Sequence, residues 1–166
     1  ALGRQAASQG TMNNLTIGTE EGTLYETIGG GSGGSPEGPG AAAVQVHMTN
    51  TPATDVEELE NRLPLQLESW RIRPSSGGAG RHRGGDGVEK TWRFLLPAEV
   101  SILAGRRDHG APGLAGGRGG LPGQDLREQD GVWSTAPRQY RAEPGERLRI
   151  ATPGGGGWGG PEPTEG

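Results

Sequence analysis

The stretch Val88–Leu96, VEKTWRFLL, alternates between two kinds of side chain with a period of two residues. This period is typical of a β-strand with one face buried. The face expected to point into a core carries Val88, Lys90, Trp92, Phe94 and Leu96, and the face expected to meet water carries Glu89, Thr91 and Arg93. We therefore predict a strand here and a sheet around it.

Other segments carry the same pattern in shorter form. LQLESWRIR at 65–73 alternates and then changes phase between Leu67 and Trp70, which predicts a strand with a β-bulge. EVSILAG at 99–105 and ERLRIAT at 146–152 predict two further strands, and residues 9–28 predict short polar strands and turns. AAAVQVHMTN predicts a strand through Val44 and Val46, with His47 on the opposite face.

One helix is expected between Thr54 and Leu63. The sequence TDVE has the form of a capping box, in which the Thr54 hydroxyl accepts a hydrogen bond from the Glu57 amide. Val56, Leu59 and Leu63 form one apolar stripe, and Pro64 ends the helix. The fold class is thus α+β and mostly β, with short strands, Gly/Pro-rich turns and one short capped helix. Cap and helix dipole also explain the acidic residues of this segment without any catalytic role.

The chain has 166 residues, among them 34 Gly and 13 Pro. That length fits a single domain. The glycines are clustered between segments rich in Val, Leu, Ile and Trp, which is typical of ordered elements joined by tight turns. Residues 29–40 are expected to form a Gly-rich loop, and residues 152–166 a Gly/Pro-rich tail.

Charge and composition exclude several classes of protein. The net charge is -4 and the arginines are scattered, so a nucleic-acid-binding surface is not expected. No run approaches the roughly 20 apolar residues of a membrane span, so no membrane association is expected. The chain has no cysteine, which excludes disulfides and thiolate sites and leads us to expect a cytoplasmic protein.

Glycine-rich motifs offer little support for nucleotide binding. Gly29, Gly31 and Gly34 match the dinucleotide-binding pattern, but the following SPEGPG cannot form the helix that this pattern requires. Lys90 is the only lysine, and it lies in a predicted strand, so the chain has no Walker A loop. TPGGGGWGG at 152–160 offers consecutive backbone amides, which form either an anion cradle or a simple turn.

The three histidines have no spacing typical of metal ligands. His82 and His109 lie in arginine-rich turns. His47 lies close in sequence to Asn50, Thr51 and a helix N-terminus, so it lines a polar pocket or serves as a hydrogen-bonded structural histidine.

Several motifs occur in an order that resembles one family. They are QGTMNN, YETIGGG, HMTNT with TDVEELENR, SGGAG, RGGDG, a paired RR before GLAGG, and PGERLRI before TPGGGG. Together they resemble the C-terminal part of the hydantoinase B/oxoprolinase family. This family is similar to the C-terminal half of ATP-dependent oxoprolinase and to the alpha subunits of acetone and acetophenone carboxylases. The resemblance implies a C-terminal fragment of a larger subunit or a separately encoded piece of it.

The resemblance also implies an activity. It is the ATP-dependent opening of a cyclic amide such as 5-oxoproline or a hydantoin, with ATP bound by a hydantoinase A-like partner that phosphorylates the substrate oxygen. A divalent metal ion and an oligomeric assembly are further expectations. The alternatives are a fragment of a carboxylase alpha subunit and a noncatalytic scaffold or interface domain.

Candidate site residues follow from the motifs that carry the resemblance. The catalytic candidates are His47, Asn50 and Thr51, with His47 also the candidate metal ligand, and the candidates for substrate or anion binding are Gly29, Gly30, Gly31, Arg81 and Asp86. An alternative for Asp86 is that it only holds a turn and pairs with Arg81 or Arg83.

Overall fold

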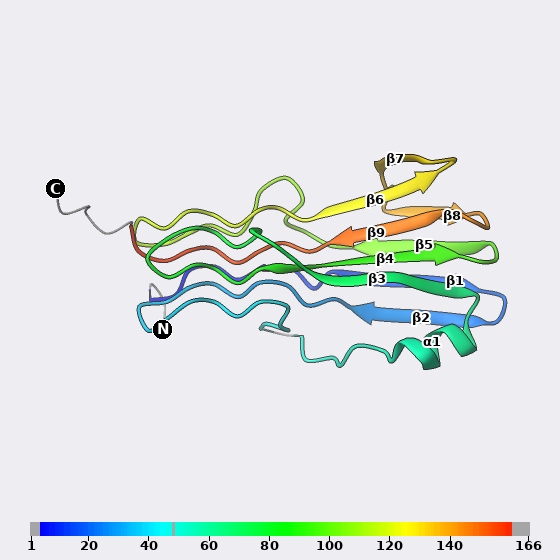
Figure 1. Cartoon of the computed structure of the whole chain (residues 1–166), viewed down its shortest axis with the longest axis horizontal. Helices are drawn as coiled ribbons and strands as arrows, with labels where there is room; N and C mark the ends of the chain where they lie inside the picture. The colour runs from blue at the N-terminus through cyan, green and yellow to red at the C-terminus, as the bar shows by residue number, and fades with distance from the viewer. Residues whose placement is uncertain (1–3, 48, 161–166) are drawn as a thin grey trace.

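A computed structural model describes residues 4–47 and 49–160. The molecule is elongated and has two halves along its long axis (Figure 1). One half is a β-sandwich with the helix α1 at its side, and the other is a bundle of extended segments that belong to no sheet (Figure 1). Most strands of the sandwich continue directly into a segment of the bundle, so the two halves share the same pieces of chain.

The sandwich consists of two antiparallel sheets. The first has the order β2 (Gly22–Thr27), β1 (Asn14–Thr19), β5 (Ala98–Leu103) and β8 (Gln139–Ala142). The second has the order β3 (Leu65–Arg73), β4 (Gly87–Phe94), β9 (Arg147–Ala151), β6 (Gln124–Gln129) and β7 (Val132–Thr135). The predicted α+β, mostly β class is confirmed.

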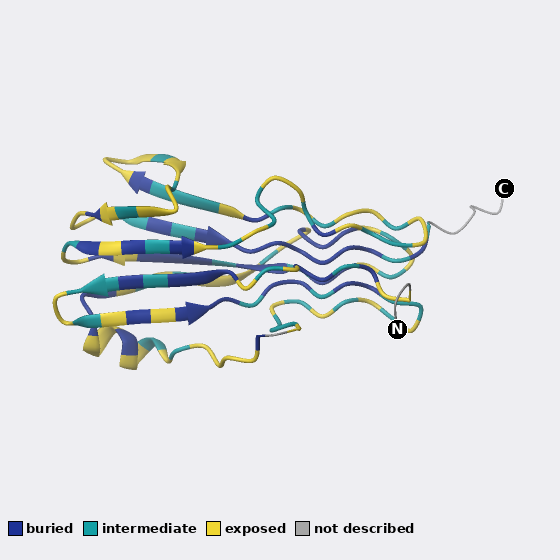
Figure 2. Cartoon of the chain, turned by 180° about the vertical axis from the view of Figure 1, so that it is seen from behind, coloured by how far each residue is buried: buried dark blue, intermediate teal, exposed yellow. Residues whose placement is uncertain are grey.

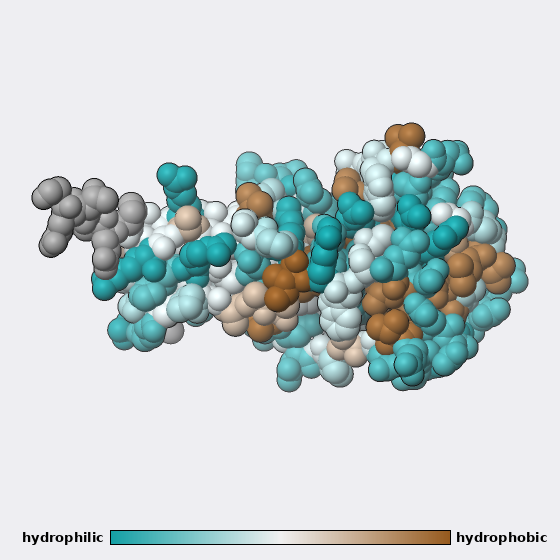
Figure 3. All heavy atoms as spheres, in the orientation of Figure 1, coloured by the Kyte–Doolittle hydropathy of each residue, from teal (hydrophilic) through white to brown (hydrophobic). Residues whose placement is uncertain are grey.

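The core lies between the sheets and follows the two-residue period of the strands. The first sheet contributes Leu15, Ile17, Val100 and Ile102, and the second contributes Trp92, Phe94, Leu148 and Ile150, all buried. In Figure 3 most of the apolar surface lies over the sandwich half, with one further apolar patch near the middle of the molecule. Because the cluster of buried apolar side chains lies in the sandwich, burial of apolar surface stabilises the sandwich far more than the bundle.

Strand β4 follows its predicted pattern with two exceptions. Val88, Lys90, Trp92 and Phe94 are buried as expected. Thr91 was expected to meet water but is buried, because the Arg149 side chain covers it and its Nε lies 3.4 Å from the Thr91 Oγ1. Leu96 was expected in the core but is exposed, because the strand ends at Phe94.

Two further strand predictions have opposite outcomes. The bulge in β3 is confirmed, since the pairing with β4 shifts register between Leu67 and Ser69. The strand through Val44 and Val46 is wrong, because this segment makes only an isolated bridge, between Gly30 and Val44. The segment belongs to the bundle instead.

Helix α1 spans Val56–Arg62, inside the predicted range. Its N-cap is Asp55, whose Oδ1 accepts hydrogen bonds from the amides of Glu57 (2.9 Å) and Glu58 (3.1 Å). The predicted capping box at Thr54 is therefore wrong by one residue, because a carboxylate takes the amide expected for the hydroxyl. Leu59 is buried as part of the core. The helix itself lies beside the sandwich edge formed by β2 and β3 (Figure 1).

Backbone hydrogen bonds in the bundle recur every third residue. The amides of Gly31 and Gly34 donate to the carbonyls of Pro153 and Gly156, and those of Gly154 and Gly157 donate to Leu121 and Arg118. A β-strand repeats every second residue, whereas a polyproline II helix has three residues per turn. The bundle is therefore an array of polyproline II-type segments joined by hydrogen bonds between them.

Glycines 154–157 show why this array needs glycine. A Cβ added to Gly154 would lie 2.0 Å from the Ser76 carbonyl oxygen, and one on Gly155 would lie 1.9 Å from that of Ser32. A Cβ on Gly156 would meet Pro112 and one on Gly157 would meet Ala79, each at the carbonyl oxygen. Successive glycines thus face different neighbouring segments. Dark traces in Figure 2 mark the buried interior of this half.

The expected loop and tail are thus largely parts of the bundle. Residues 29–40 and 152–160 carry no strand of either sheet, as expected. Gly30, Gly31, Gly33 and Gly34 are nevertheless buried, as are residues 152–157. Residues 161–166 of the expected tail lie outside the described residues.

The close packing of the bundle predicts that one added methyl group, introduced by a Gly→Ala substitution, strongly lowers the stability of the fold. We expect Gly155→Ala to lower the free energy of unfolding by about 3 kcal/mol. The added Cβ would collide with a backbone carbonyl group, which cannot move aside as the end of a flexible side chain could. Gly38→Ala is the matched control, since a Cβ there meets nothing within 4 Å, and it should cost under about 0.5 kcal/mol. Urea unfolding of the 166-residue chain measures both, and equal midpoints would contradict the role of the bundle.

Candidate functional site

The predicted catalytic residues lie on one exposed turn. Thr49 is buried at its centre, where its Oγ1 donates to the Val46 carbonyl oxygen (2.9 Å) and accepts from the Val46 amide (3.2 Å). His47 has a φ of 58°, in the left-handed region, and is exposed. Asn50 and Thr51 are exposed as well, and Met48 of the HMTNT motif lies outside the described residues.

Thr51 lines a small cleft where the sandwich meets the bundle. The cleft has a volume of about 140 Å³ and lies at the β2 and β3 edges of the two sheets. Its walls are formed by Glu26, Thr27, Ile28, Gly29, Ala43, Gln45, Thr51, Ala53, Trp70, Val88 and Lys90. The structure thus brings Thr51 and Gly29 together, whereas His47 and Asn50 do not line this space.

A buried ion pair lies in the wall of the cleft. The Lys90 Nζ donates to the Glu26 Oε1, and the two side chains are only 4% and 5% exposed. The same ammonium lies 4.1 Å from the ring centroid of Trp70 and 5.7 Å from that of Trp92. Carboxylate and aromatic rings together compensate the buried positive charge.

Sequence reasoning did not identify Glu26, Gln45, Trp70 or Lys90 as site residues. The sequence did contain a signal for two of these four residues. Lys90 occupies the apolar face of a predicted strand, where a charged side chain needs a buried partner. Glu26 belongs to the YETIGGG motif, which leads directly into the bundle.

The predicted glycine sites are engaged within the bundle. The Gly30 amide donates to the Val44 carbonyl oxygen (3.0 Å), and the Gly31 amide donates to that of Pro153 (3.1 Å). The amides of residues 154–157 donate to the carbonyls of Leu121, Gly85, Ala7 and Arg118. The anion-cradle interpretation of TPGGGG is therefore wrong, because all four of these amides already have partners.

Arg81 and Asp86 belong to the bundle as well. The Asp86 Oδ1 accepts from the Gly77 amide at 2.7 Å and lies 3.5 Å from the Arg83 Nη2. These contacts support the alternative that Asp86 holds a turn. The Arg81 amide donates to the Gly159 carbonyl oxygen (3.1 Å), and neither Arg81 nor Asp86 lines the cleft.

A metal site is not apparent in the described part of the chain. Within residues 4–47 and 49–160, no three His, Cys, Asp or Glu side chains gather closely enough to hold an ion. Metal binding by His47 stays a prediction. His82 exchanges two backbone hydrogen bonds with Trp158, and His109 is exposed.

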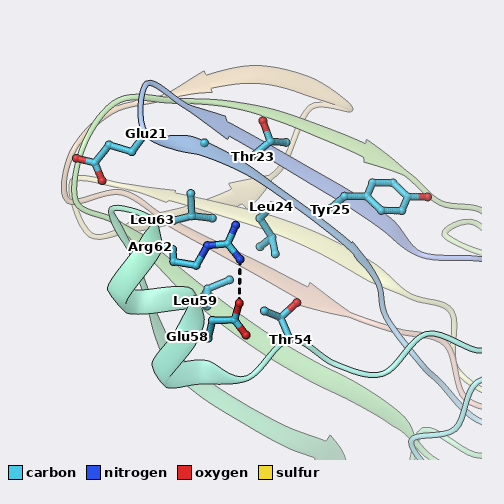
Figure 4. Close-up of a pocket in the computed structure, with 10 residues that line it drawn as sticks. Glu21, Thr23, Leu24, Tyr25, Thr54, Glu58, Leu59, Arg62 and Leu63 are labelled. Atoms are coloured by element: carbon cyan, nitrogen blue, oxygen red, sulfur yellow. Dashed lines mark hydrogen bonds and ion pairs between the residues drawn. The ribbon is translucent and has the colours of Figure 1, made fainter.

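Figure 4 shows a second hollow, between α1 and β2. Leu24, Leu59 and Leu63 line it together with Thr23 and Thr54, and Glu58 and Arg62 form an ion pair of 2.8 Å beside them. This pair spans one helical turn on an exposed surface and stabilises the helix only slightly. The hollow is explained by the packing of a short helix against a sheet edge.

Tyr140, a partly buried residue with a buried hydroxyl group, lies away from the cleft. Burial raises the pKa of Tyr140 far above its ordinary value, because the phenolate loses its hydration. The Arg127 guanidinium lies 4.6 Å from the Tyr140 ring centroid and opposes this rise in pKa. Tyr140 thus remains protonated at neutral pH and is no candidate for a general base.

Comparison with known proteins identifies the family. The sequence profile described as Hydantoinase B/oxoprolinase matches residues 1–161. The chain belongs to the hydantoinase B/oxoprolinase family. No helix in the described part of this family member is both long and apolar enough to cross a membrane.

Relatives of this hydantoinase B/oxoprolinase family member are far longer. The chain is 46% identical over 157 residues to "5-oxoprolinase 1" of Arabidopsis thaliana, and the match covers 93% of the chain and 12% of that protein. It is 44% identical over 162 residues to the "5-oxoprolinase" of Dictyostelium discoideum, where the match covers 96% of the chain and 13% of that protein. The chain thus corresponds to a minor part of each relative.

Two solved structures share its fold. The ATP-dependent caprolactamase from Pseudomonas jessenii matches with a TM-score of 0.77 and 25% identity over 95% of this chain and 30% of that chain. The nucleotide-free structure of an acetone carboxylase matches with a TM-score of 0.70 and 18% identity over 93% and 26%. At this lower identity the second match shows a common fold alone.

The buried ion pair predicts a specific pattern of stability. Lys90→Met should lower the free energy of unfolding by about 3 kcal/mol, because it leaves Glu26 buried without its cation. Adding Glu26→Leu should recover most of that loss. The exposed pair supplies the control, since Arg62→Met should cost under about 1 kcal/mol. Equal losses for Lys90→Met and Arg62→Met in chemical denaturation would contradict this account.

The three histidines predict a ranking of activities, to be measured with this segment placed within an active enzyme of its family. His47→Ala should lower kcat at least about a hundredfold if the histidine transfers a proton, the lower end of the range for general acid–base catalysis. His109→Ala is the control, because His109 is exposed as His47 is. His82→Ala is a second control, in the bundle, where the His82 backbone pairs with that of Trp158. Equal kcat values for folded His47 and His109 variants would assign His47 no catalytic role.

Proposed function

We propose that this chain is part of an ATP-dependent amidohydrolase that opens a cyclic amide such as 5-oxoproline or a hydantoin. It acts with an ATP-binding partner of the hydantoinase A type. The observation that carries this proposal is the 46% identity to a 5-oxoprolinase over 93% of the chain. The shared fold with an ATP-dependent caprolactamase supports the same reaction class.

The partner's role follows from the stability of amides. Phosphorylation of the amide oxygen by ATP releases ADP and makes the ring carbon electrophilic. Water adds to this carbon, the ring C–N bond breaks as nitrogen takes a proton, and a second water hydrolyses the resulting acyl phosphate to carboxylate and phosphate. The transferred phosphoryl group carries negative charge throughout, so donors or a divalent cation are needed close to its oxygens. In this proposal ATP is bound by the partner, and a divalent metal ion assists the reaction.

This chain contributes the turn with His47, Asn50 and Thr51 and the cleft beside it. His47 is exposed at the turn surface, where it is accessible to a substrate held partly by other segments. Thr51 connects the turn to the cleft wall. In the proposal His47 activates water, and Asn50 and Thr51 orient substrate.

A second candidate is a noncatalytic scaffold or interface role within the same kind of enzyme. The saturated hydrogen bonding of residues 154–157 favours it, because these amides hold the bundle together and have no donor left for a substrate. A third candidate is a carboxylase alpha-subunit fragment, with the common fold of acetone carboxylase as its support.

Phosphate release distinguishes these candidates. The isolated chain with ATP, a divalent metal and 5-oxoproline should release no phosphate above background. The longer parent enzyme with its ATP-binding partner should show turnover that 5-oxoproline or hydantoin stimulates. Turnover stimulated by acetone and bicarbonate instead would support the carboxylase, and substrate-stimulated turnover by the isolated chain would overturn the need for a partner.

The scaffold role requires a separate test. In the parent enzyme, alanine at Asn50 and Thr51 should lower kcat while the assembly stays intact by gel filtration. Full activity of both variants would favour the scaffold over a site contributed by this turn.

A further inference from the structure

Gly18 lies inside strand β1, where neither the backbone conformation nor the packing requires glycine. Its φ is outside the left-handed region, and the nearest heavy atom to a Cβ added there would be the Glu99 carbonyl oxygen, at 4.0 Å. The bundle glycines differ, because a Cβ on Gly155 would collide with a carbonyl group. Glycine weakens a strand, and within a strand it often marks a place where a ligand or another backbone approaches closely.

The position of Gly18 is on the outer face of the first sheet. Ile17 is buried in the core, so the next residue of the strand points to the opposite side. There Gly18 pairs with Glu99 of β5, and Glu99 pairs with Arg141 of β8. Figure 2 looks onto this face, and no described helix or loop lies over its strands. The backbone at Gly18 is therefore open to a partner.

A groove of about 360 Å³ lies at Gly18. Its apolar lining comes from Ala98 and from Leu96 and Pro97 in the turn between β4 and β5. Leu96, predicted to lie in the core, is 45% exposed here. Because Gly18 has no side chain, the groove extends to the backbone of β1 and leaves room for a large apolar side chain.

The charged side chains of the groove favour a basic partner. Glu20, Glu99 and Arg141 line it. Arg141 lies 3.7 Å from the Glu99 carboxylate and 3.5 Å from that of Glu143, so one guanidinium is divided between two carboxylates. Glu20 adds a third negative charge, and the Glu99 side chain is 71% exposed. This excess of negative charge attracts Lys or Arg side chains of a partner.

The longer relatives contain a source for such a partner. The matched segment makes up 12% of the Arabidopsis protein and 30% of the caprolactamase chain, so each has long stretches outside it. We propose that the groove at Gly18 is a docking site for a segment of the same enzyme subunit that lies outside these 166 residues. That segment inserts an apolar side chain flanked by Lys or Arg. The inference goes beyond the proposed function and does not depend on its substrate class.

Titration of the 166-residue chain with capped tripeptides, followed by nuclear magnetic resonance, tests the chemistry of the partner. The probes are acetyl-Lys-Leu-Lys-amide, the Lys-Gly-Lys analogue without the apolar side chain, and the Glu-Leu-Glu analogue with the opposite charge. The first should shift the amide signals of Gly18 and Glu99. It should bind at least about tenfold more tightly than the other two, a factor that burial of one leucine side chain can supply. Equal affinities, or shifts that spare both residues, would overturn the site.

Gly18→Val fills the groove and leaves the packing of the sandwich unchanged. The urea midpoint of the chain should not fall, because the added side chain meets open space, whereas binding of the Lys-Leu-Lys probe should weaken at least about tenfold. Gly38→Val is the matched control, since a Cβ there also meets nothing within 4 Å, and binding should persist. Unchanged binding in folded Gly18→Val would contradict the assignment.

Glu99→Gln tests the charge of the groove and serves if Gly18→Val does not fold. It should weaken binding of the Lys-Leu-Lys probe and make that binding less sensitive to salt. Asp130→Asn is the control, because Asp130 is exposed between β6 and β7 in the other sheet. Equal effects of the two substitutions would remove the charge argument and the basic partner with it.

Docking itself is measured in an active enzyme of the family that carries this segment. There Gly18→Val should lower the melting temperature relative to Gly38→Val, opposite to its effect on the isolated chain. Equal melting temperatures would overturn the docking site. A dimer of the isolated chain that Gly18→Val dissociates would assign the groove to a second copy, and release of a separate subunit from the enzyme would assign it to that subunit. Either result would overturn the proposal.

Discussion

The close approach of backbone to backbone in the glycine bundle is the constraint on which the rest of the structure depends. Residues 154–157 contact different neighbouring segments in turn, and a Cβ at each of these positions would collide with a carbonyl group. Hydrogen bonds between segments replace the apolar burial that stabilises an ordinary core. Because strands of both sheets continue into this array, the bundle also fixes where the sandwich edges and the cleft between them lie.

A buried polar network joins the bundle to the sandwich. The Asn13 Nδ2 donates to the Gln9 Oε1 at 2.6 Å, and the Asn13 Oδ1 accepts from the Arg107 Nη1 at 3.0 Å. The Arg107 Nη2 in turn donates to the Asp125 Oδ1 at 2.7 Å. A Cβ on Gly30 would lie 1.9 Å from the Gln9 Oε1, so the network also needs glycine. These contacts give the QGTMNN, YETIGGG and RR motifs a structural role.

The sequence predicts the sandwich well and the bundle poorly, for a physical reason. Side-chain alternation reports burial on a sheet face, so β4 and the bulge in β3 can be read from apolar positions. The bundle is built from backbone contacts, and glycine has no side chain to report them. Residues 29–40 were therefore predicted to form a Gly-rich loop, although Gly30 and Gly31 are buried.

The candidate site likewise combines features that the sequence predicts with features that it does not. The family motif drew attention to His47, Asn50 and Thr51, and the structure places only Thr51 in the cleft wall. The ion pair of Glu26 with Lys90 joins residues that are 64 positions apart, which no local pattern can indicate. Lys90 was assigned correctly to the core face, but its partner depends on how the two sheets stack.

Amide hydrogen exchange of residues 154–157 tests the central claim most directly. If these amides hold a rigid bundle, they should exchange as slowly as those of Leu148 and Ile150 in β9, which requires global unfolding. Exchange at the rate of an unprotected glycine, with β9 still protected, would show that the Gly-rich segment is a loose loop and would contradict the account.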